Sequence, residues 1–483
     1  MSMPSTQPAP SGNPLVRVLR AVISVFREYI NGLRGLFTCP RELWLAFLIK
    51  VMESLCYFSS VLVLMAFLTQ DMGLSDVWAG TIFSIFSASM SLFMLFVGFV
   101  ADSLGIKKAL IVGLVIALVG RMSIAFTTSP WIVYPGLIVL SVGFAYTIPL
   151  LAAAVALFST KRTQKFAFSW YYVVMNVGSL LAGLSLDWLR GIFTQTIEFS
   201  VLGTNIVVRP TQMIFLVAVV TTILSMIIVV FCIRSKIPEK ESVNDEAPDT
   251  AEAKKTATTD TKPSESPFQV MVEVVRERTF WIFIVFIFLL VMVKMIFQYN
   301  HSLYPLYMER IGLKLWTGKL YAINPAIVIL LVPVMTAITS RMNAYKVILY
   351  GSFIAAGSVF ILGLGESIVY IVLFQVVLSI GEAIYSPRVY DYTASIAPPG
   401  REASYMAYSK APMFFAKVAT GPASGFLLLH LCPEQGERNT ELMWIIVGIS
   451  TIISPITLWL GRKWLDVQTR KDALDESVAK ASA

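Results

Sequence analysis

Charged side chains interrupt an otherwise apolar stretch that runs from about residue 368 to residue 396. Residues 381–387 read Gly-Glu-Ala-Ile-Tyr-Ser-Pro, so the stretch contains Glu382, and Arg388 and Asp391 follow. An ionised group in hydrocarbon is costly, and such groups persist mainly where they pair or line a water-filled path. The stretch is therefore predicted to form one wall of a polar cavity inside a membrane, with Glu382 facing a solute.

A second charged pair, Lys50 and Glu53, lies in the first long apolar run. Residues three apart share one face of a helix. At a rise of 1.5 Å per residue, Glu53 would lie about 15 Å into a membrane-spanning helix, close to the midplane. The pair is interpreted as a proton-coupling or gating element, and a purely structural ion pair between helices is the alternative.

A third basic group, Lys294, lies deep in the seventh apolar run and is followed by Asn300 and His301. Lys294 is predicted to bind a substrate carboxylate or to pair with Glu53 or Glu382, and Asn300 is a candidate polar ligand. His301 has a side chain that titrates near neutral pH. Its place near the end of the run predicts instead a solvated histidine.

Other residues in the apolar runs complete the candidate set. Arg121 is assigned to gating with Arg388 and Asp391, and Lys417 is a further intramembrane cation. Tyrosine offers an apolar ring and a hydroxyl, which suits the lining of an amphipathic pocket. The tyrosines considered for that lining are Tyr57, Tyr171, Tyr172 and Tyr385.

The composition identifies the bilayer as the solvent of this chain. Of 483 residues, 56% are hydrophobic and 14% are charged, whereas soluble domains carry about 25% charged residues. Twelve apolar runs approach the ~20 residues that a spanning helix needs, and each must be helical because lipid cannot satisfy exposed backbone groups. The predicted spans lie at about 43–69, 77–101, 108–127, 131–158, 167–186, 211–233, 279–303, 317–338, 346–364, 368–396, 405–430 and 442–461.

The basic residues of the short loops predict the orientation. Lys107, Lys108, Lys346 and Arg462 fall in loops on one side, which predicts cytoplasmic termini. The net charge of +8 reflects these loops and does not indicate a nucleic-acid partner. The predicted organisation is a disordered N-terminus with an interfacial helix (1–42), a six-helix bundle (43–233), a polar linker (234–278), a second six-helix bundle (279–461) and a cytoplasmic tail (462–483).

The sequence offers no pattern typical of an enzyme or of a cofactor site. The four cysteines are scattered, without the spacing of a disulfide framework or a metal site. Neither a nucleotide-binding loop nor a nucleophile–base pair stands out. The expected protein is a multi-pass, monomeric membrane protein without cofactor or metal. Its partners are the lipid bilayer, a small-molecule solute and protons, and a gradient is its energy source.

An internal repeat relates the two halves at a constant offset of 238 residues. Gly143 and Pro149 recur as Gly381 and Pro387, and Gly113 recurs as Gly351. Two six-helix halves joined by a polar linker are a parallel-repeat transporter arrangement, with the substrate bound between the halves near the midplane.

The loop after the second span reads Gly98-Phe-Val-Ala-Asp102-Ser-Leu-Gly105-Ile-Lys107-Lys108. This resembles the loop motif of the major facilitator superfamily, which implies that superfamily's twelve-helix fold. In that resemblance Asp102 would pair with basic groups or a helix N-terminus and latch one conformation.

A narrower resemblance lies in the fifth and tenth spans. Residues 168–180, Phe-Ser-Trp-Tyr-Tyr-Val-Val-Met-Asn-Val-Gly-Ser-Leu, look like the signature of the proton-coupled oligopeptide transporter family, and so does the pattern around Glu382. The resemblance implies proton-coupled transport of di- and tripeptides or similar zwitterions. Glu382 would then hold the peptide amino terminus through a charge-assisted hydrogen bond.

The first span departs from that family. The family's Glu-x-x-Glu-Arg is replaced by Lys50, Glu53 and Ser54, and its fourth-span lysine falls on Ile148. These departures leave two alternatives open. One is a facilitative or organic-anion carrier of the same fold without proton coupling, and the other is a non-transporting membrane receptor.

Overall fold

A computed structural model describes residues 23–24, 27, 30–31, 33–104, 106–160, 163–201, 204–234, 276, 278–339, 342–396 and 411–466. Within these residues, twelve helices are long and apolar enough to cross a membrane. The prediction of twelve spans is thereby confirmed. The predicted N-terminal interfacial helix, polar linker and C-terminal tail lie largely outside the described residues.

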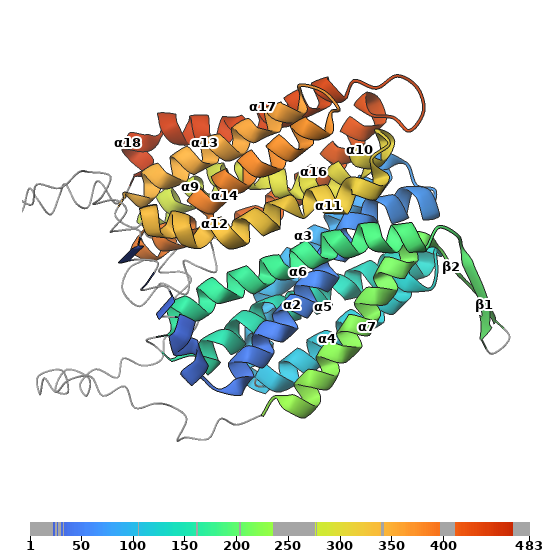
Figure 1. The fold of residues 1–483 in the computed structure, drawn as a ribbon, viewed down its shortest axis with the longest axis horizontal. Coiled ribbons are helices and arrows are strands. Elements are labelled where there is room, and N and C mark those ends of the chain that lie inside the picture. Colours follow the sequence, from blue (N-terminus) through green and yellow to red (C-terminus); the bar gives the residue numbers. More distant parts are fainter. Residues whose placement is uncertain are drawn as a thin grey trace, which may run out of the picture.

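The helices form two groups that follow each other along the chain (Figure 1). The first group is α2 (Arg41–Ala66), α3 (Asp76–Leu104), α4 (Ile106–Ala125), α5 (Pro130–Phe158), α6 (Gln164–Ile192) and α7 (Pro210–Cys232). The second is α9 (Arg278–Ser302), α10 (Tyr304–Arg310), α11 (Thr317–Tyr321), α12 (Ile323–Thr339), α13 (Ala344–Leu362), α14 (Ile368–Ile396), α16 (Ala411–Leu431), α17 (Thr440–Leu460) and α18 (Arg462–Leu465). Single turns occur at Leu36–Thr38, Phe67–Asp71 and Lys314–Trp316.

The predicted eighth span is broken into α11 and α12. The break follows Tyr321 and precedes an Asn324-Pro325 pair. Proline lacks an N–H donor, and its ring crowds the carbonyl four residues earlier, which here belongs to Tyr321. The interruption turns the Asn324 side chain toward α14, where it contributes to the site described below.

A β-hairpin connects α6 to α7. Strands β1 (Ile197–Val201) and β2 (Thr204–Val208) are antiparallel, and Ile197 pairs with Val208. The hairpin projects from one end of the helical bundle (Figure 1). This end, which also carries α10 and α11, is called the hairpin end below. The C-terminus of α17 and α18 lie at the opposite end.

The internal repeat is visible in the packing. Gly143 of α5 lies against Ala117 of α4, and Gly381 of α14 lies against Ala355 of α13, which are the same positions 238 residues later. In both pairs a Cβ on the glycine would collide with backbone atoms of the alanine. The two halves therefore repeat one close helix–helix contact that only glycine permits.

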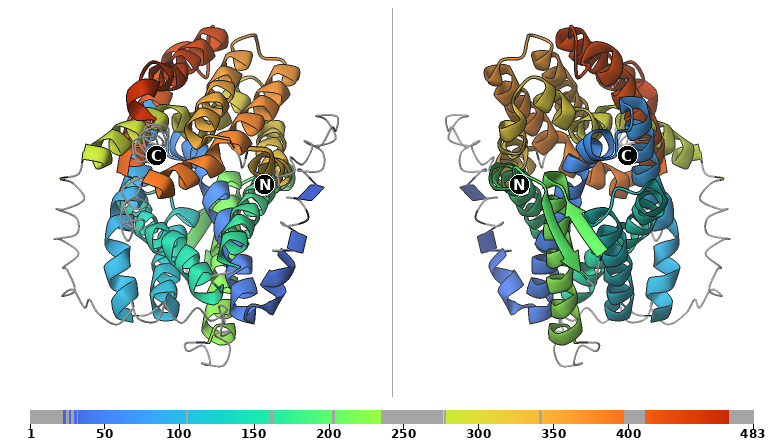
Figure 2. Two further views of the ribbon diagram at one scale, coloured as in Figure 1. Left: turned by 90° about the vertical axis from the view of Figure 1, so that its left-hand side faces the viewer. Right: turned by 90° about the vertical axis from the view of Figure 1, so that its right-hand side faces the viewer.

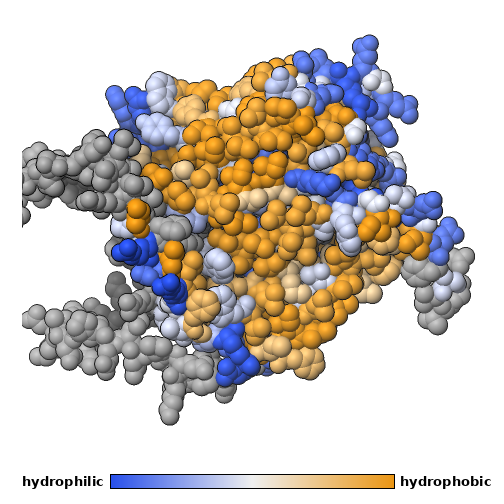
Figure 3. All heavy atoms as spheres, in the orientation of Figure 1, coloured by the Kyte–Doolittle hydropathy of each residue, from blue (hydrophilic) through white to orange (hydrophobic). Residues whose placement is uncertain are grey.

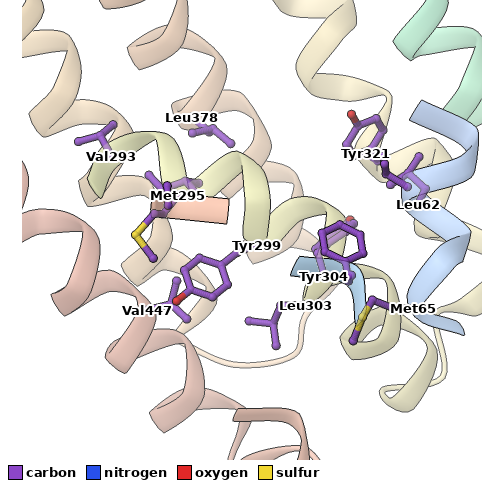
Figure 4. Close-up of a cluster of buried hydrophobic side chains, with 14 of the residues drawn as sticks. Leu62, Met65, Val293, Met295, Tyr299, Leu303, Tyr304, Tyr321, Leu378 and Val447 are labelled. Carbon is purple, nitrogen blue, oxygen red and sulfur yellow. The ribbon is translucent and has the colours of Figure 1, made fainter. Parts of the chain in front are cut away.

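The two halves lie on opposite sides of the molecule (Figure 2) and contact each other toward the hairpin end (Figure 1). Gly80 of α3 meets Gly421 of α16 backbone to backbone, and Gly183 of α6 meets Gly318 of α11 in the same way. Apolar side chains fill the space beside these crossings, where Leu62 and Met65 of α2 lie near Tyr321 and Tyr304 (Figure 4).

Polar contacts fasten the hairpin end. Arg310 of α10 holds Asp76 of α3 through two hydrogen bonds of 2.6 and 2.9 Å, and both side chains are nearly buried. Asp187 of α6 accepts the backbone N–H groups of Gly318 and Lys319 at 2.9 and 2.7 Å. Hydrogen bonds in which one partner is ionised are stronger than those between neutral groups. These bonds therefore add to the glycine contacts in holding the halves together.

The outer surface matches a lipid environment. Exposed large apolar residues occur on most spanning helices, including Val119, Leu184, Phe231, Leu330 and Ile449. Apolar side chains cover the middle of the face shown in Figure 3, and hydrophilic ones gather toward its ends. This is the inverse of a soluble surface and shows an integral, multi-pass membrane protein.

A side chain at Gly318 is expected to open the hairpin end. The new Cβ would collide with the backbone carbonyl of Gly183, which cannot move aside unless α6 and α11 separate. Overpacking costs about 1–3 kcal/mol, so Gly318→Val should raise the ratio of separated to joined halves at least about fivefold.

Spin labels on Gln70 and Glu434 can report this opening. Both residues are exposed and line one surface pocket at the hairpin end, although they belong to different halves. Gly318→Val should move their distance distribution to longer values. Gly357→Val is the matched control, because a Cβ there meets nothing within 4 Å. An unchanged distribution in Gly318→Val would show that the glycine contact does not control closure.

Candidate functional site

Glu382 of α14 is the centre of a polar cluster that joins the two halves. Its side chain is buried, with the whole residue 8% exposed. The hydroxyl of Tyr172, from α6 in the other half, donates to one carboxylate oxygen at 2.9 Å. The amide of Asn324 in α12 donates to the other oxygen at 3.0 Å. Side chains of both halves thus hydrogen-bond to one carboxylate.

Further hydrogen bonds orient the Asn324 donor. Asn324 also donates to the hydroxyl of Ser379 at 3.1 Å, and Ser379 donates to the Gln375 carbonyl at 2.5 Å. Lys294 of α9 lies within electrostatic range of the Glu382 carboxylate. The two residues are 88 positions apart in the sequence, and their direct pairing remains a prediction.

Lys50 and Glu53 form the predicted pair on one face of α2. The Lys50 ammonium lies 2.7 Å from Glu53 Oε2, and the side chains are only 5% and 3% exposed. Among the described residues, Glu53 Oε1 has no hydrogen-bond partner. A buried carboxylate oxygen with spare accepting capacity is able to take a proton or another donor when the surroundings change.

Neighbouring tyrosines of α6 connect this pair to the Glu382 cluster. The Lys50 ammonium lies 5.2 Å from the ring centroid of Tyr171, and the next residue, Tyr172, binds Glu382. Successive residues on a helix point about 100° apart, so α6 presents one tyrosine to each half of the protein. A shift of α6 would disturb both charged groups together.

Aromatic side chains extend the site toward the hairpin end. His301 of α9 packs on Tyr57 and Phe58 of α2 with ring centroids 6.5 and 5.8 Å apart. Its Nε2 lies 3.2 Å from the Tyr321 hydroxyl, which in turn lies 3.1 Å from the hydroxyl of Ser179 in α6. The expectation of a solvated His301 is wrong, because closure of the halves buries the residue to 7% exposure.

Three other predicted site residues are buried. Tyr385 is 1% exposed and packs against Gly351 of α13. Arg388 donates from Nε to the Thr339 hydroxyl of α12 at 3.1 Å and also binds the Thr339 carbonyl. Asn300 is 3% exposed in α9. Their positions suit bracing of the helices that carry Glu382 and Lys294.

Arg121 occupies the core of the N-terminal half. Its guanidinium donates to the Thr222 hydroxyl of α7 and lies 4.9 Å from the ring centroid of Phe144. Asp102 and Asp391 belong to α3 and α14, but their side chains lie outside the described residues. The proposed latch and the second tenth-span carboxylate therefore remain predictions.

Several site residues escaped the sequence-based prediction. Asn324 was visible as a polar residue before a proline in an apolar run, which is a usable signal. Asp76, Asp187 and Arg310 stand near helix ends, where a charge is ordinarily solvated, so their sequence positions carried no signal. Lys417, which the sequence indicates only as a further intramembrane cation, donates to Ser91 of the other half at 3.0 Å.

Two six-helix halves that close over paired intramembrane charges define a membrane transport protein. A family model of the Major Facilitator Superfamily matches residues 46–411, and the chain belongs to this superfamily. Within the described residues, no group of three or more His, Cys, Asp or Glu side chains is placed to hold a metal ion.

Curated relatives match over part of the chain. A dipeptide and tripeptide permease A of Proteus mirabilis is 27% identical over 168 residues, 34% of each chain. The permease of the same name from Escherichia coli K12 is 25% identical over 178 residues, 36% of each chain. The matched region thus spans about a third of the length of these relatives.

Solved structures match over nearly the whole fold. A POT family transporter in complex with 5-aminolevulinic acid has a TM-score of 0.66 at 16% identity and covers 88% of this chain and 97% of its own. A structure concerned with substrate recognition in proton dependent oligopeptide transporters has a TM-score of 0.67 at 17% identity, covering 89% and 99%. At these identities the likeness shows a shared fold.

Proposed function

We propose that this protein is a secondary active transporter that moves small zwitterions, such as di- and tripeptides or amino acid derivatives, by alternating access. The observation that carries the proposal is the Glu382 carboxylate, bonded to Tyr172 of the other half and within electrostatic reach of Lys294. In this proposal, Glu382 binds the substrate ammonium and Lys294 binds its carboxylate. A zwitterion satisfies both charges at once.

The comparisons support the same substrate class. The curated relatives are named as dipeptide and tripeptide permeases, and a similar fold has been solved with 5-aminolevulinic acid, itself an amino acid derivative. When substrate binds Glu382, Tyr172 would lose its partner, and this would loosen one of the contacts between the halves. Binding and conformational change are then linked through one hydrogen bond.

The arrangement of the halves supports alternating access. Their glycine crossings and the Arg310–Asp76 pair lie toward the hairpin end. The basic loops that predict the cytoplasmic side, with Lys108 and Lys346, lie at the opposite end. With the predicted orientation, the structure is closed toward the outside, and a single chain provides both halves of the site. We therefore expect a monomer to suffice.

Proton coupling is the finer part of the proposal. Glu53 is held by Lys50 through one oxygen while its other oxygen is unbonded among the described residues. Protonation of Glu53 would release Lys50, whose charge then becomes available to a substrate carboxylate or to Tyr171. Repeated exchange of this partner would couple proton movement to the transport cycle.

A proton-independent anion carrier is the second candidate. It is favoured by Lys417, a cation 7% exposed between the halves that is hydrogen-bonded to the neutral Ser91. With Lys50 and Lys294, this residue places three lysines inside the bundle. An organic anion would be attracted by them without any need for the Glu382 carboxylate.

Proteoliposomes distinguish these candidates. Labelled dipeptide uptake should exceed its equilibrium level when an inward proton gradient is imposed, and it should return to equilibrium when an ionophore collapses the gradient. Liposomes without protein and an excess of unlabelled dipeptide are the controls. Uptake of a dicarboxylate with no response to pH would favour the anion carrier, and no exchange of any labelled solute would favour the receptor.

A further inference from the structure

A cavity of about 410 Å³ opens at the end of the molecule opposite the hairpin, between α13, α17 and α18. Its floor contains the buried residues Tyr345, Leu349 and Asp466. The cavity is separate from the Glu382 cluster, because the residues that line it come from the first turns of α13, the last turn of α17 and the segment beyond.

Three basic residues and two exposed aromatic residues form the rim of this cavity. Lys346, Arg462 and Lys463 are exposed, as are Tyr350 and Trp459. The Arg462 guanidinium lies 4.9 Å from the ring centroid of Trp459. One carboxylate, Asp466, accompanies the three cations, so the lining carries a net positive charge. Aromatic rings beside basic groups are typical of the boundary between headgroups and hydrocarbon.

The repeat shows that these cations are not required to close the helix ends. In the N-terminal half, Lys107 donates to the carbonyls of Val230 and Ile233 at the end of α7, at 3.0 and 2.5 Å. The position 238 residues later is Tyr345, whose hydroxyl donates to the Leu458 carbonyl near the end of α17 at 2.6 Å. In the C-terminal half, Tyr345 thus makes the hydrogen bond to the helix end that Lys107 makes in the N-terminal half. The basic residues here surround a cavity instead.

The helix α18, which carries Arg462 and Lys463, is held against the bundle by its last residue. Leu465 of α18 is 1% exposed, and its carbonyl accepts a hydrogen bond of 2.6 Å from the Tyr392 hydroxyl of α14. Arg462 and Lys463 are therefore presented by a short helix anchored at its far end. A site whose backbone is fixed before binding loses less entropy when a ligand arrives.

The outer face of α17 continues the cavity along the bilayer. Ile449, Ile453, Ile456 and Leu460 are 41–68% exposed and recur every three or four residues, which places them on one face of the helix. Leu460, at one end of this apolar stripe, directly follows the rim residue Trp459 in the sequence. The basic rim suits a phosphate group, and the apolar stripe suits acyl chains. A phospholipid contains both.

We propose that this cavity binds the phosphate headgroup of an anionic glycerophospholipid, whose acyl chains lie along the outer face of α17. Lys346, Arg462 and Lys463 would contact the phosphate, and Asp466 would accept hydrogen bonds from headgroup hydroxyls. Basic pockets between spanning helices on the cytoplasmic side attract anionic headgroups, and this end of the molecule is the predicted cytoplasmic side. The site joins α13 to α17, two helices of the C-terminal half.

Native mass spectrometry of the purified full chain, titrated with phosphatidylglycerol, phosphatidylcholine and phosphatidylethanolamine, tests the proposal. Phosphatidylglycerol should bind at least tenfold more tightly than phosphatidylcholine. A surface cation contributes about 1 kcal/mol to binding an anionic lipid, which is about fivefold in affinity. Lys463→Gln and Lys346→Gln should therefore each weaken phosphatidylglycerol binding about fivefold, and together about 25-fold.

Lys108→Gln is the matched control. Lys108 is the repeat counterpart of Lys346, is exposed at the same end and does not line the cavity, so binding should stay within twofold of the unaltered protein. Equal affinity for the three lipids, or equal losses in Lys108→Gln and Lys463→Gln, would overturn the proposal. So would inorganic phosphate that displaces phosphatidylglycerol at equal concentration, because the site would then recognise a free anion.

Discussion

Glu382→Gln is expected to lower dipeptide transport about 10- to 150-fold while leaving the protein folded in the membrane. Glutamine has the size of glutamate and can still accept a hydrogen bond from Tyr172 or Asn324. It cannot offer a charge to the substrate ammonium, and hydrogen bonds to a charged group contribute about 1.5–3 kcal/mol. That range corresponds to the expected loss in kcat/KM, measured as initial uptake into proteoliposomes at matched protein content.

Two further variants delimit this prediction. Glu437→Gln alters an exposed residue between α16 and α17, and should transport at the unaltered rate. Tyr172→Phe removes a hydrogen bond to Glu382 that the proposed substrate ammonium displaces, so it should reduce transport only several-fold. Transport by Glu382→Gln at the unaltered rate would exclude this carboxylate from substrate binding, and the proposed zwitterion site would lose its anionic half.

Glu53→Leu is expected to destabilise the protein by about 3–5 kcal/mol. Lys50 would remain charged in a site that is 5% exposed, with its 2.7 Å partner removed. Removing one member of a buried ion pair has a cost of this size, whereas replacing both by apolar residues is often neutral or stabilising. Thermal unfolding in detergent should therefore show a large loss for Glu53→Leu and a recovery for the Lys50→Leu/Glu53→Leu double variant.

The double variant separates the two interpretations of this pair. If Lys50 and Glu53 gate transport or carry protons, the double variant regains stability but remains inactive in gradient-driven uptake. If the pair is only a structural ion pair, the same variant recovers both properties together. A Glu53→Leu protein as stable as the unaltered one would show that Lys50 finds another partner, and the inference from burial would be wrong.

The sequence predicted the local part of the site correctly, and the nonlocal part needed the structure. Lys50 and Glu53 are three residues apart, so helical spacing alone placed them together. Lys294 was left with two possible partners, Glu53 and Glu382, because hydropathy does not say how one helix is rotated against another. The Glu382 contact with Tyr172 links residues separated by 210 positions, beyond the reach of any periodicity.

His301 shows why depth in the membrane was harder to predict than membership of a span. Its position near the end of α9 indicated solvent, and this holds for a helix considered alone. In the structure the other half covers that end through Tyr57 and Phe58, and the histidine is buried. Burial at a helix end depends on how the two halves contact each other, and the sequence of a single span does not predict that contact.

The sequence by itself was enough to predict that this protein lies in a lipid bilayer, that it has twelve spans and that its halves are an internal repeat. These properties follow from the length and apolarity of each segment, and the bilayer imposes them one helix at a time. The tertiary structure decided which intramembrane charges share a site, which end of the bundle is closed, and that Arg310 meets Asp76. Those features depend on how separate helices fit against each other, since their free energy comes from contacts between residues that lie far apart in the sequence.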